Sequence, residues 1–282
     1  MPRFTSPEHS PKRPGGQHTP RKRFGQHFLR DRNILDKLVR AAEIQPSDTV
    51  LEIGPGRGDL TRALSETGAQ VVAVEVDRDL AARLPEELSA PNVKILQGDI
   101  LSQSPEAWLA EAQCRPPYLV AANLPYYITS AILRYLLEAP TPPTRLVVMV
   151  QREVAQQMTA QPPHSNLLAV SVQFYGAPRV VEVVPAGAFY PPPKVDSAIV
   201  HIQTHSAQPA IAPQLFFQVA RAGFGTKRKQ LRNALANGLH LSREEAERLL
   251  ARAQVDPARR AETLNLAEWA QLARGFEQSR LP

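Results

Sequence analysis

The stretch NLPYY at 123–127 carries side chains suited to holding a planar group with an exocyclic amine. It follows a short apolar run at 118–122 and precedes a helix-like segment at 129–137, which predicts a loop between a strand and a helix. Such loops lie at the carboxyl ends of strands in an open α/β sheet, where ligands bind. An Asn offers an acceptor and a donor, and a Tyr ring offers a face for stacking a base. A turn with a capping Asn and two core tyrosines is the alternative.

A glycine-rich loop indicates a nucleoside-containing cofactor. The apolar run TVLEIG at 49–54 predicts a buried strand, and it leads into GPGRGD at 54–59. Glycines there permit a tight turn and let the backbone approach a ligand closely. Glu75 ends the next predicted strand, at 70–76, where an acid accepts hydrogen bonds from ribose hydroxyls. A plain strand–helix–strand unit is the alternative, and Glu52 fits either the loop or the edge of the core.

Asp99 is a second acid at a predicted strand tip. It ends the strand expected at 93–99 and would accept a hydrogen bond from an adenine amine. Its alternative role is the N-cap of a helix predicted at 100–112. A further strand is expected at 145–151, followed by a helix at 153–160.

A triple proline lies between the last two predicted strands. These strands, at 179–184 and 198–203, flank FYPPPKVDS at 189–197. Consecutive prolines hold a loop extended and stiff, which would fix Phe189 as a second ring near the site. Two strands joined in this way predict an antiparallel edge on a parallel sheet.

The charge is concentrated at the two ends of the chain. Residues 1–30 carry seven Lys/Arg and one Glu, and residues 206–282 carry twelve Lys/Arg against seven Asp/Glu. Residues 31–205 carry fourteen against nineteen. An acidic body with basic ends is typical of a small-molecule site flanked by nucleic-acid-binding surfaces. Residues 1–20, rich in Pro, Gly and basic side chains, are expected to be a disordered arm, either touching RNA or merely solvated.

Beyond a boundary at 203–213, the pattern predicts only helices, at 214–224, 227–237, 242–253 and 265–276. The segment FGTKRKQLRN at 224–233 is strongly basic. On a helix, two of its arginines would share a face. We predict an RNA-phosphate patch rather than a solvated face, formed by Arg221, Lys227, Arg228, Lys229 and Arg232.

Several classes of protein are disfavoured. The single cysteine, Cys114, excludes an internal disulfide and a thiolate metal cluster, and it suits a reducing cytoplasm. The seven histidines show no ligand spacing, so no metal is expected. The apolar runs are too short to span a membrane, and the basic N-terminus is not a secretory signal. A monomer is expected.

The order of motifs resembles that of the ribosomal RNA adenine dimethyltransferases of the KsgA type. The resemblance covers the chain from about Lys22 to about Leu272. The triple proline and the basic helical tail place it nearer to this housekeeping family than to the antibiotic-resistance rRNA methylases. The motifs that carry it are QHFL, LEIGPGRGDLT, VEVDRDL, QGDIL, NLPYYITSAIL, FYPPPKVDSAIV and FGTKRKQLRNAL.

The resemblance implies a Rossmann-like α/β methyltransferase sheet of seven mostly parallel strands, within a domain at 21–205. It implies a small all-helical, rRNA-binding domain at 206–282, S-adenosylmethionine as cofactor, and two adjacent adenosines near the 3′ end of 16S rRNA in the small ribosomal subunit as target. The residues implied to contact the cofactor are His27, Leu29, Gly54, Glu75, Asp99 and Asn123.

The chain departs from this family in two places. His27 stands where many relatives have Asn, so a contact through the backbone is the one expected to persist. The segment SNLL at 165–168 replaces an expected YGR-like segment.

The catalytic hypothesis follows from the loop at 123–127. The Asn123 side-chain oxygen and the Leu124 carbonyl would accept hydrogen bonds from adenine N6, with Pro125 stiffening the loop. Tyr126 would stack on the base, and Phe189 would lie against its other face or edge. Two other classes compete with this hypothesis, namely a ribosome-assembly factor that mainly binds an immature subunit and an oxidoreductase that uses the same glycine loop.

Overall fold

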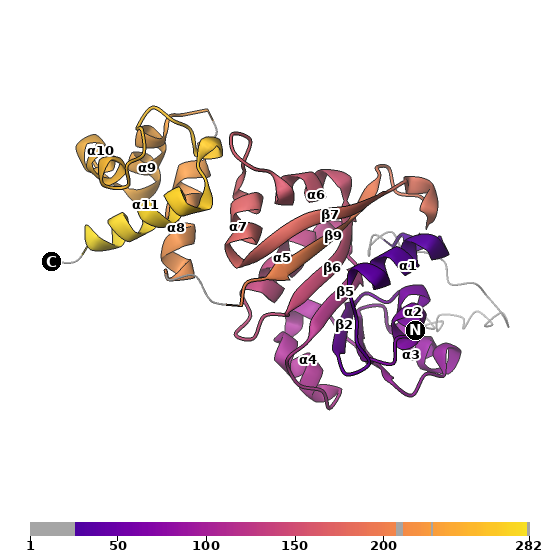
Figure 1. The fold of residues 1–282 in the computed structure, drawn as a ribbon. Coiled ribbons are helices and arrows are strands. Elements are labelled where there is room, and N and C mark those ends of the chain that lie inside the picture. Colours follow the sequence, from indigo (N-terminus) through magenta and orange to yellow (C-terminus); the bar gives the residue numbers. More distant parts are fainter. Residues whose placement is uncertain (1–25, 207–210, 227, 281–282) are drawn as a thin grey trace, which may run out of the picture.

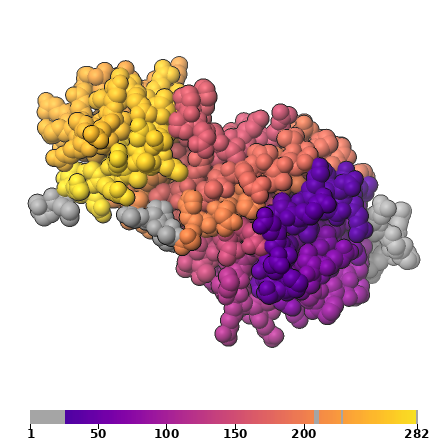
Figure 2. Space-filling model, in the orientation of Figure 1, coloured from indigo at the N-terminus to yellow at the C-terminus, as the bar shows by residue number. Residues whose placement is uncertain are grey.

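The computed structural model describes residues 26–206, 211–226 and 228–280. The predicted arm at 1–20 lies outside them. Figure 1 shows a central sheet flanked by helices, with the C-terminal helices gathered into a smaller lobe at one end. The space-filling view shows the same two lobes, the smaller one in yellow (Figure 2).

The central sheet has seven strands in the order β4-β3-β2-β5-β6-β9-β7. The first five strands in this order form four parallel pairs, and β9 runs antiparallel to both β6 and β7. This confirms the predicted mostly parallel sheet with an antiparallel edge. The strand bounds are Thr49–Ile53 (β2), Gln70–Glu75 (β3), Val93–Gln97 (β4), Leu119–Asn123 (β5), Arg145–Gln151 (β6), Gly176–Val184 (β7) and Ser197–Thr204 (β9).

Helices cover both faces of the sheet because its strands carry apolar side chains on both sides. Along β5, Leu119 packs with the helices α1 and α2, whereas Val120 packs with α4, α5 and α6 on the opposite face. Both residues are fully buried. The helices are Arg32–Ala41 (α1), Asp59–Ser65 (α2), Arg78–Leu88 (α3), Pro105–Glu111 (α4), Thr129–Leu137 (α5), Arg152–Thr159 (α6) and Leu167–Tyr175 (α7).

In the first lobe, one predicted helix was wrong and one helix was missed. The helix expected at 100–112 is a 3-10 turn, Ile100–Ser102, followed by α4, because the chain is extended at Gln103 and Ser104 caps a new helix. The helix α7 was not predicted. It is almost wholly apolar, so it lacks the periodicity that marks a half-exposed helix.

The C-terminal lobe has a core of its own. Its helices are Pro213–Phe224 (α8), Leu231–Leu239 (α9), Arg243–Arg252 (α10) and Leu266–Gln278 (α11). Trp269 is fully buried at its centre and lies so close to Gly223 that any side chain there would collide with the indole. Val170 and Phe174 of α7 join this core, so it extends across the boundary expected at 203–213.

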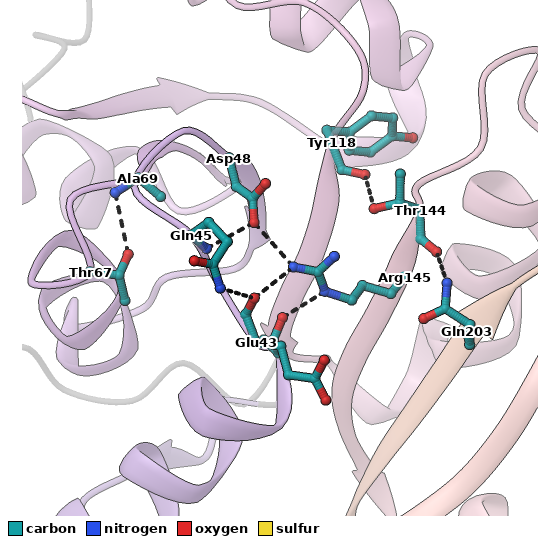
Figure 3. Close-up of polar contacts among 10 residues, drawn as sticks. Glu43, Gln45, Asp48, Thr67, Ala69, Tyr118, Thr144, Arg145 and Gln203 are labelled. Atoms are coloured by element: carbon teal, nitrogen blue, oxygen red, sulfur yellow. Dashed lines mark hydrogen bonds and ion pairs between the residues drawn. The ribbon is translucent and has the colours of Figure 1, made fainter.

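Arg145, the first residue of β6, is bonded to the connection between α1 and β2 at the amino-terminal edge of the sheet (Figure 3). Its guanidinium donates to the carbonyls of Ala42 and Glu43 at 2.6 and 3.0 Å and to the Asp48 carboxylate at 3.1 Å. The side chain is only 19% exposed. These bonds hold the connection between α1 and β2 against β6, at the end of the sheet opposite the strand tips.

We expect Arg145→Met to lower the free energy of unfolding by roughly 2–4 kcal/mol, because it leaves carbonyls and a carboxylate without their charged donor. Denaturant titration measures this loss. The matched control is Arg83→Met, which removes an exposed pair with Glu87 and should change stability by less than about 0.5 kcal/mol. Equal effects of the two variants would contradict the role assigned to Arg145.

Candidate active site

A cavity of about 1170 Å³, including its solvent mouth, lies at the carboxyl ends of β2, β3, β4 and β5. Two short strands, β1 (Phe28–Leu29) and β8 (Phe189–Tyr190), pair antiparallel beside it, and β1 forms part of its wall. The structure brings together at this cavity nine of the ten predicted cofactor-binding and catalytic residues, namely His27, Leu29, Gly54, Glu75, Asp99, Asn123, Leu124, Pro125 and Tyr126.

The Asn123 amide is held in one orientation. Its Nδ2 donates to the His27 carbonyl at 3.1 Å, which fixes Oδ1 as the opposite end of the amide. Oδ1 is buried and accepts no hydrogen bond from the described residues. The Leu124 N–H donates to the Met149 carbonyl at 3.1 Å and so fixes the path of the loop. The site therefore presents a buried acceptor that lacks a donor.

Tyr126 and His27 connect this loop to two distant motifs. The Tyr126 hydroxyl hydrogen-bonds to the Ser197 hydroxyl, and its ring stacks on His27 at 5.9 Å with an interplanar angle of 20°. The His27 Nδ1 lies 2.8 Å from the Pro191 carbonyl oxygen. Burial raises the pKa of Tyr126, although the bond to Ser197 opposes the shift. The ring of Tyr126 is thus fixed at both its edge and its face.

The glycine loop is shaped by Glu75. Gly54 and Gly56 have φ angles of 69° and 60°, which disfavour any side chain. The Glu75 carboxylate accepts hydrogen bonds from the Gly56 and Asp77 N–H groups at 2.9 and 2.8 Å. A side chain on Gly56 would also meet the Phe28 ring, 2.9 Å from its Cβ position. Glu75 therefore orders the loop in addition to lining the cavity.

Asp99 lies at the cavity and also caps the turn that follows it. It lines the cavity, and its Oδ1 accepts from the Leu101 N–H at 3.0 Å as the cap of the 3-10 turn. Trp108 supports this turn because its Nε1 donates to the Ile100 carbonyl at 3.0 Å.

Glu52 and Ser197 are parts of the site for which the sequence analysis predicts no definite role. Glu52 lines the cavity but is 1% exposed, and its Oε2 has no hydrogen-bond partner among the described residues. Burial, with a smaller contribution from the charge of Glu75, raises its pKa from 4.5 to about 8. For Glu52, the only signal in the sequence is its position as an acid inside an otherwise apolar strand.

Phe189 does not lie where the catalytic hypothesis placed it. It is 4% exposed, is not among the residues lining the cavity, and packs in the core beside α1 with Leu29 and Ile199. The alternation of β8 explains this, because Phe189 and Tyr190 point to opposite sides and only Tyr190 is exposed. Here Phe189 offers the cavity no ring face.

The basic segment differs from its predicted form. The helix expected at 227–237 begins at Leu231, whose N–H donates to the Arg259 carbonyl, so Arg228 and Lys229 lie in the preceding turn. Both are exposed, as is Arg221 on α8. Arg232 is on α9 and lies 3.7 Å from the Glu247 carboxylate. Lys227 lies outside the described residues.

No helix among the described residues is both long and apolar enough to cross a bilayer. No group of three or more His, Cys, Asp or Glu side chains there is arranged to hold a metal ion.

The fold and the cavity define a methyltransferase-type α/β domain with a ligand-sized cavity at the carboxyl ends of its strands. A family model described as ribosomal RNA adenine dimethylase matches residues 17–276. The ribosomal RNA small subunit methyltransferase A of Dehalococcoides mccartyi is 51% identical over 248 residues, which cover 87% of this chain and 84% of that protein.

Two solved structures are similar over most of the chain. A dimethyladenosine transferase from Plasmodium falciparum has a TM-score of 0.77 at 25% identity, covering 89% of this chain and 98% of that one. The 23S rRNA methyltransferase ErmE has a TM-score of 0.70 at 30% identity, covering 89% and 100%. The chain belongs to the ribosomal RNA adenine dimethylase family. It is an rRNA methyltransferase whose methyl donor is S-adenosylmethionine.

Glu52→Gln should stabilise the cofactor-free protein increasingly as the pH rises. Glu52 keeps its proton when folded up to about pH 8, whereas an unfolded Glu loses it near 4.5. The wild type therefore loses stability between these values, by at most about 1.4 kcal/mol per pH unit, and Gln does not. Melting temperatures at pH 5, 6, 7 and 8 measure the difference. If the difference in melting temperature between Glu52→Gln and the wild type did not change with pH, it would contradict the assignment of Glu52 as a buried, protonated acid.

Proposed function

We propose that the protein transfers methyl groups to N6 of two adjacent adenosines near the 3′ end of 16S rRNA in the small ribosomal subunit, giving N6,N6-dimethyladenosine. The identity to small-subunit methyltransferase A supports this choice of RNA, since it exceeds the identity to ErmE. The observation that carries the chemistry is the buried Asn123 oxygen, which accepts no hydrogen bond from the part of the chain that the structure describes.

The chemistry of the cavity fits the cofactor. Its wall includes four carboxyl side chains, Glu52, Asp59, Glu75 and Asp99, which suit a ligand bearing a sulfonium, an amine and ribose hydroxyls. The glycine loop provides the close backbone approach that a nucleoside needs. S-adenosylmethionine supplies an activated methyl group when bound. Among these acids, we assign the ribose to Glu75 and the adenine amine to Asp99.

Asn123 orients the target nitrogen. The lone pair of adenine N6 is delocalised into the ring, so the enzyme must hold N6 in line and favour the positive charge that develops on it. We assign hydrogen bonds from N6 to the Asn123 Oδ1 and the Leu124 carbonyl. Because Nδ2 is held by His27, the oxygen cannot be exchanged for the amide donor without losing that bond.

Tyr126 supplies the stacking surface for a base turned out of the RNA. Its hydroxyl is tied to Ser197 and its ring to His27, so little side-chain freedom remains to be lost when a base binds. No side chain is needed as a general base, since the N6 proton becomes acidic once the methyl is attached. N6 then retains one hydrogen, which permits a second transfer.

The basic C-terminal lobe would hold the RNA. Arg221, Arg228 and Lys229 are exposed, and none has an ion-pair partner among the described residues. We assign phosphate contacts to these three and a smaller share to Arg232, which is paired with Glu247. The domain at 206–282 would then act on RNA and that at 21–205 on the methyl group, in a cytoplasmic monomer.

Methyl transfer to defined acceptors tests this function. Labelled S-adenosylmethionine would be supplied with unmethylated small subunits, naked 16S rRNA, 23S rRNA or duplex DNA, and the products would be digested and identified by mass spectrometry. We expect dimethyladenosine in the small-subunit RNA and none in 23S rRNA or DNA. Binding to subunits with no transfer to any acceptor would instead indicate an assembly factor.

A further inference from the structure

Two arginines and two aromatic rings form a cluster at the mouth of the cavity. The Arg30 guanidinium lies 4.1 Å from the centroid of the Tyr190 ring. The Arg57 guanidinium lies 4.6 Å from the Phe28 ring and 5.9 Å from the Tyr190 ring. We call Arg30, Arg57, Phe28 and Tyr190 the mouth cluster. It joins β1, β8 and the glycine loop.

The mouth cluster is adjacent to the proposed target site. Tyr190 precedes Pro191, whose carbonyl contacts the His27 ring, and that ring stacks on Tyr126. Phe28 and Arg57 are themselves part of the cavity wall. A polynucleotide that places one base on Tyr126 would therefore run its backbone close to the mouth cluster.

The charge around the mouth cluster favours an anion. Arg30, Arg57 and Arg62 all act on Asp59, where burial nevertheless dominates and raises the pKa of that carboxyl. Three guanidiniums thus lie near one acid. Arg30 is exposed, and Tyr190 is 46% exposed. A guanidinium stacked on a ring keeps its N–H edge free for bidentate contact with a phosphate.

We propose that Arg30, held flat on Tyr190, binds a backbone phosphate of the rRNA strand next to the target adenosine. This rests on the proposed function, since it takes the same RNA as ligand. A contact of this kind releases counterions, so it contributes to the salt dependence of RNA binding. If Arg30 merely fastened β8, its loss would affect melting and leave the salt dependence unchanged.

The test uses the full-length protein and small-subunit rRNA, with the affinity measured at several salt concentrations. Arg30→Gln should reduce the slope of log affinity against log salt by about 0.7–0.9, the value of one phosphate contact. Arg30→Lys keeps the charge and should keep the slope. The matched control, Arg115→Gln, removes an exposed cation just before β5, at the opposite end of the sheet, and should leave the slope unchanged.

Three results would overturn the proposal: an unchanged slope for Arg30→Gln, an equal fall for Arg115→Gln, or an equal fall for Arg30→Lys. S-adenosylmethionine affinity is measured in parallel and should not change. A weaker affinity for the cofactor would assign the guanidinium to the cofactor carboxylate instead. If the wild type bound no small-subunit rRNA, the proposed function would fail, and that result is distinct from all of these.

Discussion

The active site depends on one constraint, the bond from the Asn123 side chain to the His27 carbonyl, which joins residues 96 apart in the chain. This bond uses the donor end of the amide, so the acceptor end is left buried and without a hydrogen-bond partner among the described residues. Leaving a buried acceptor unpaired costs about 1–3 kcal/mol. A substrate donor that reaches this oxygen removes that cost, which is why the site is suited to an amine.

The same few contacts assemble three sequence motifs into one site. His27 meets Pro191, 164 residues away, and Tyr126 meets Ser197, 71 residues away. The motif around 189–197 therefore contributes a carbonyl and a hydroxyl that position other residues. Its stiff prolines suit this role, because a positioning loop must hold its backbone still.

Much of the fold was predictable because its signals are local. The strand at 145–151 agrees with β6 at both ends, since an uninterrupted apolar run bounded by polar residues has few other solutions. The cavity residues on strand tips were predictable for the same reason, because parallel strands end at one edge. Local sequence signals failed to predict those features that contacts between distant residues determine. The start of α9 is set by the Arg259 carbonyl, and the side on which Phe189 lies is set by its pairing with Leu29.

The most direct test of this account is single-turnover methyl transfer by Asn123→Ala, with cofactor and small subunits at saturating concentrations so that weakened binding does not limit the rate. Removal of one preorganised group that stabilises developing charge typically lowers a rate by about 10²–10³-fold, and we expect a loss of that size. Transfer at close to the wild-type rate would show that the buried oxygen does not act on the target nitrogen, and would contradict the account.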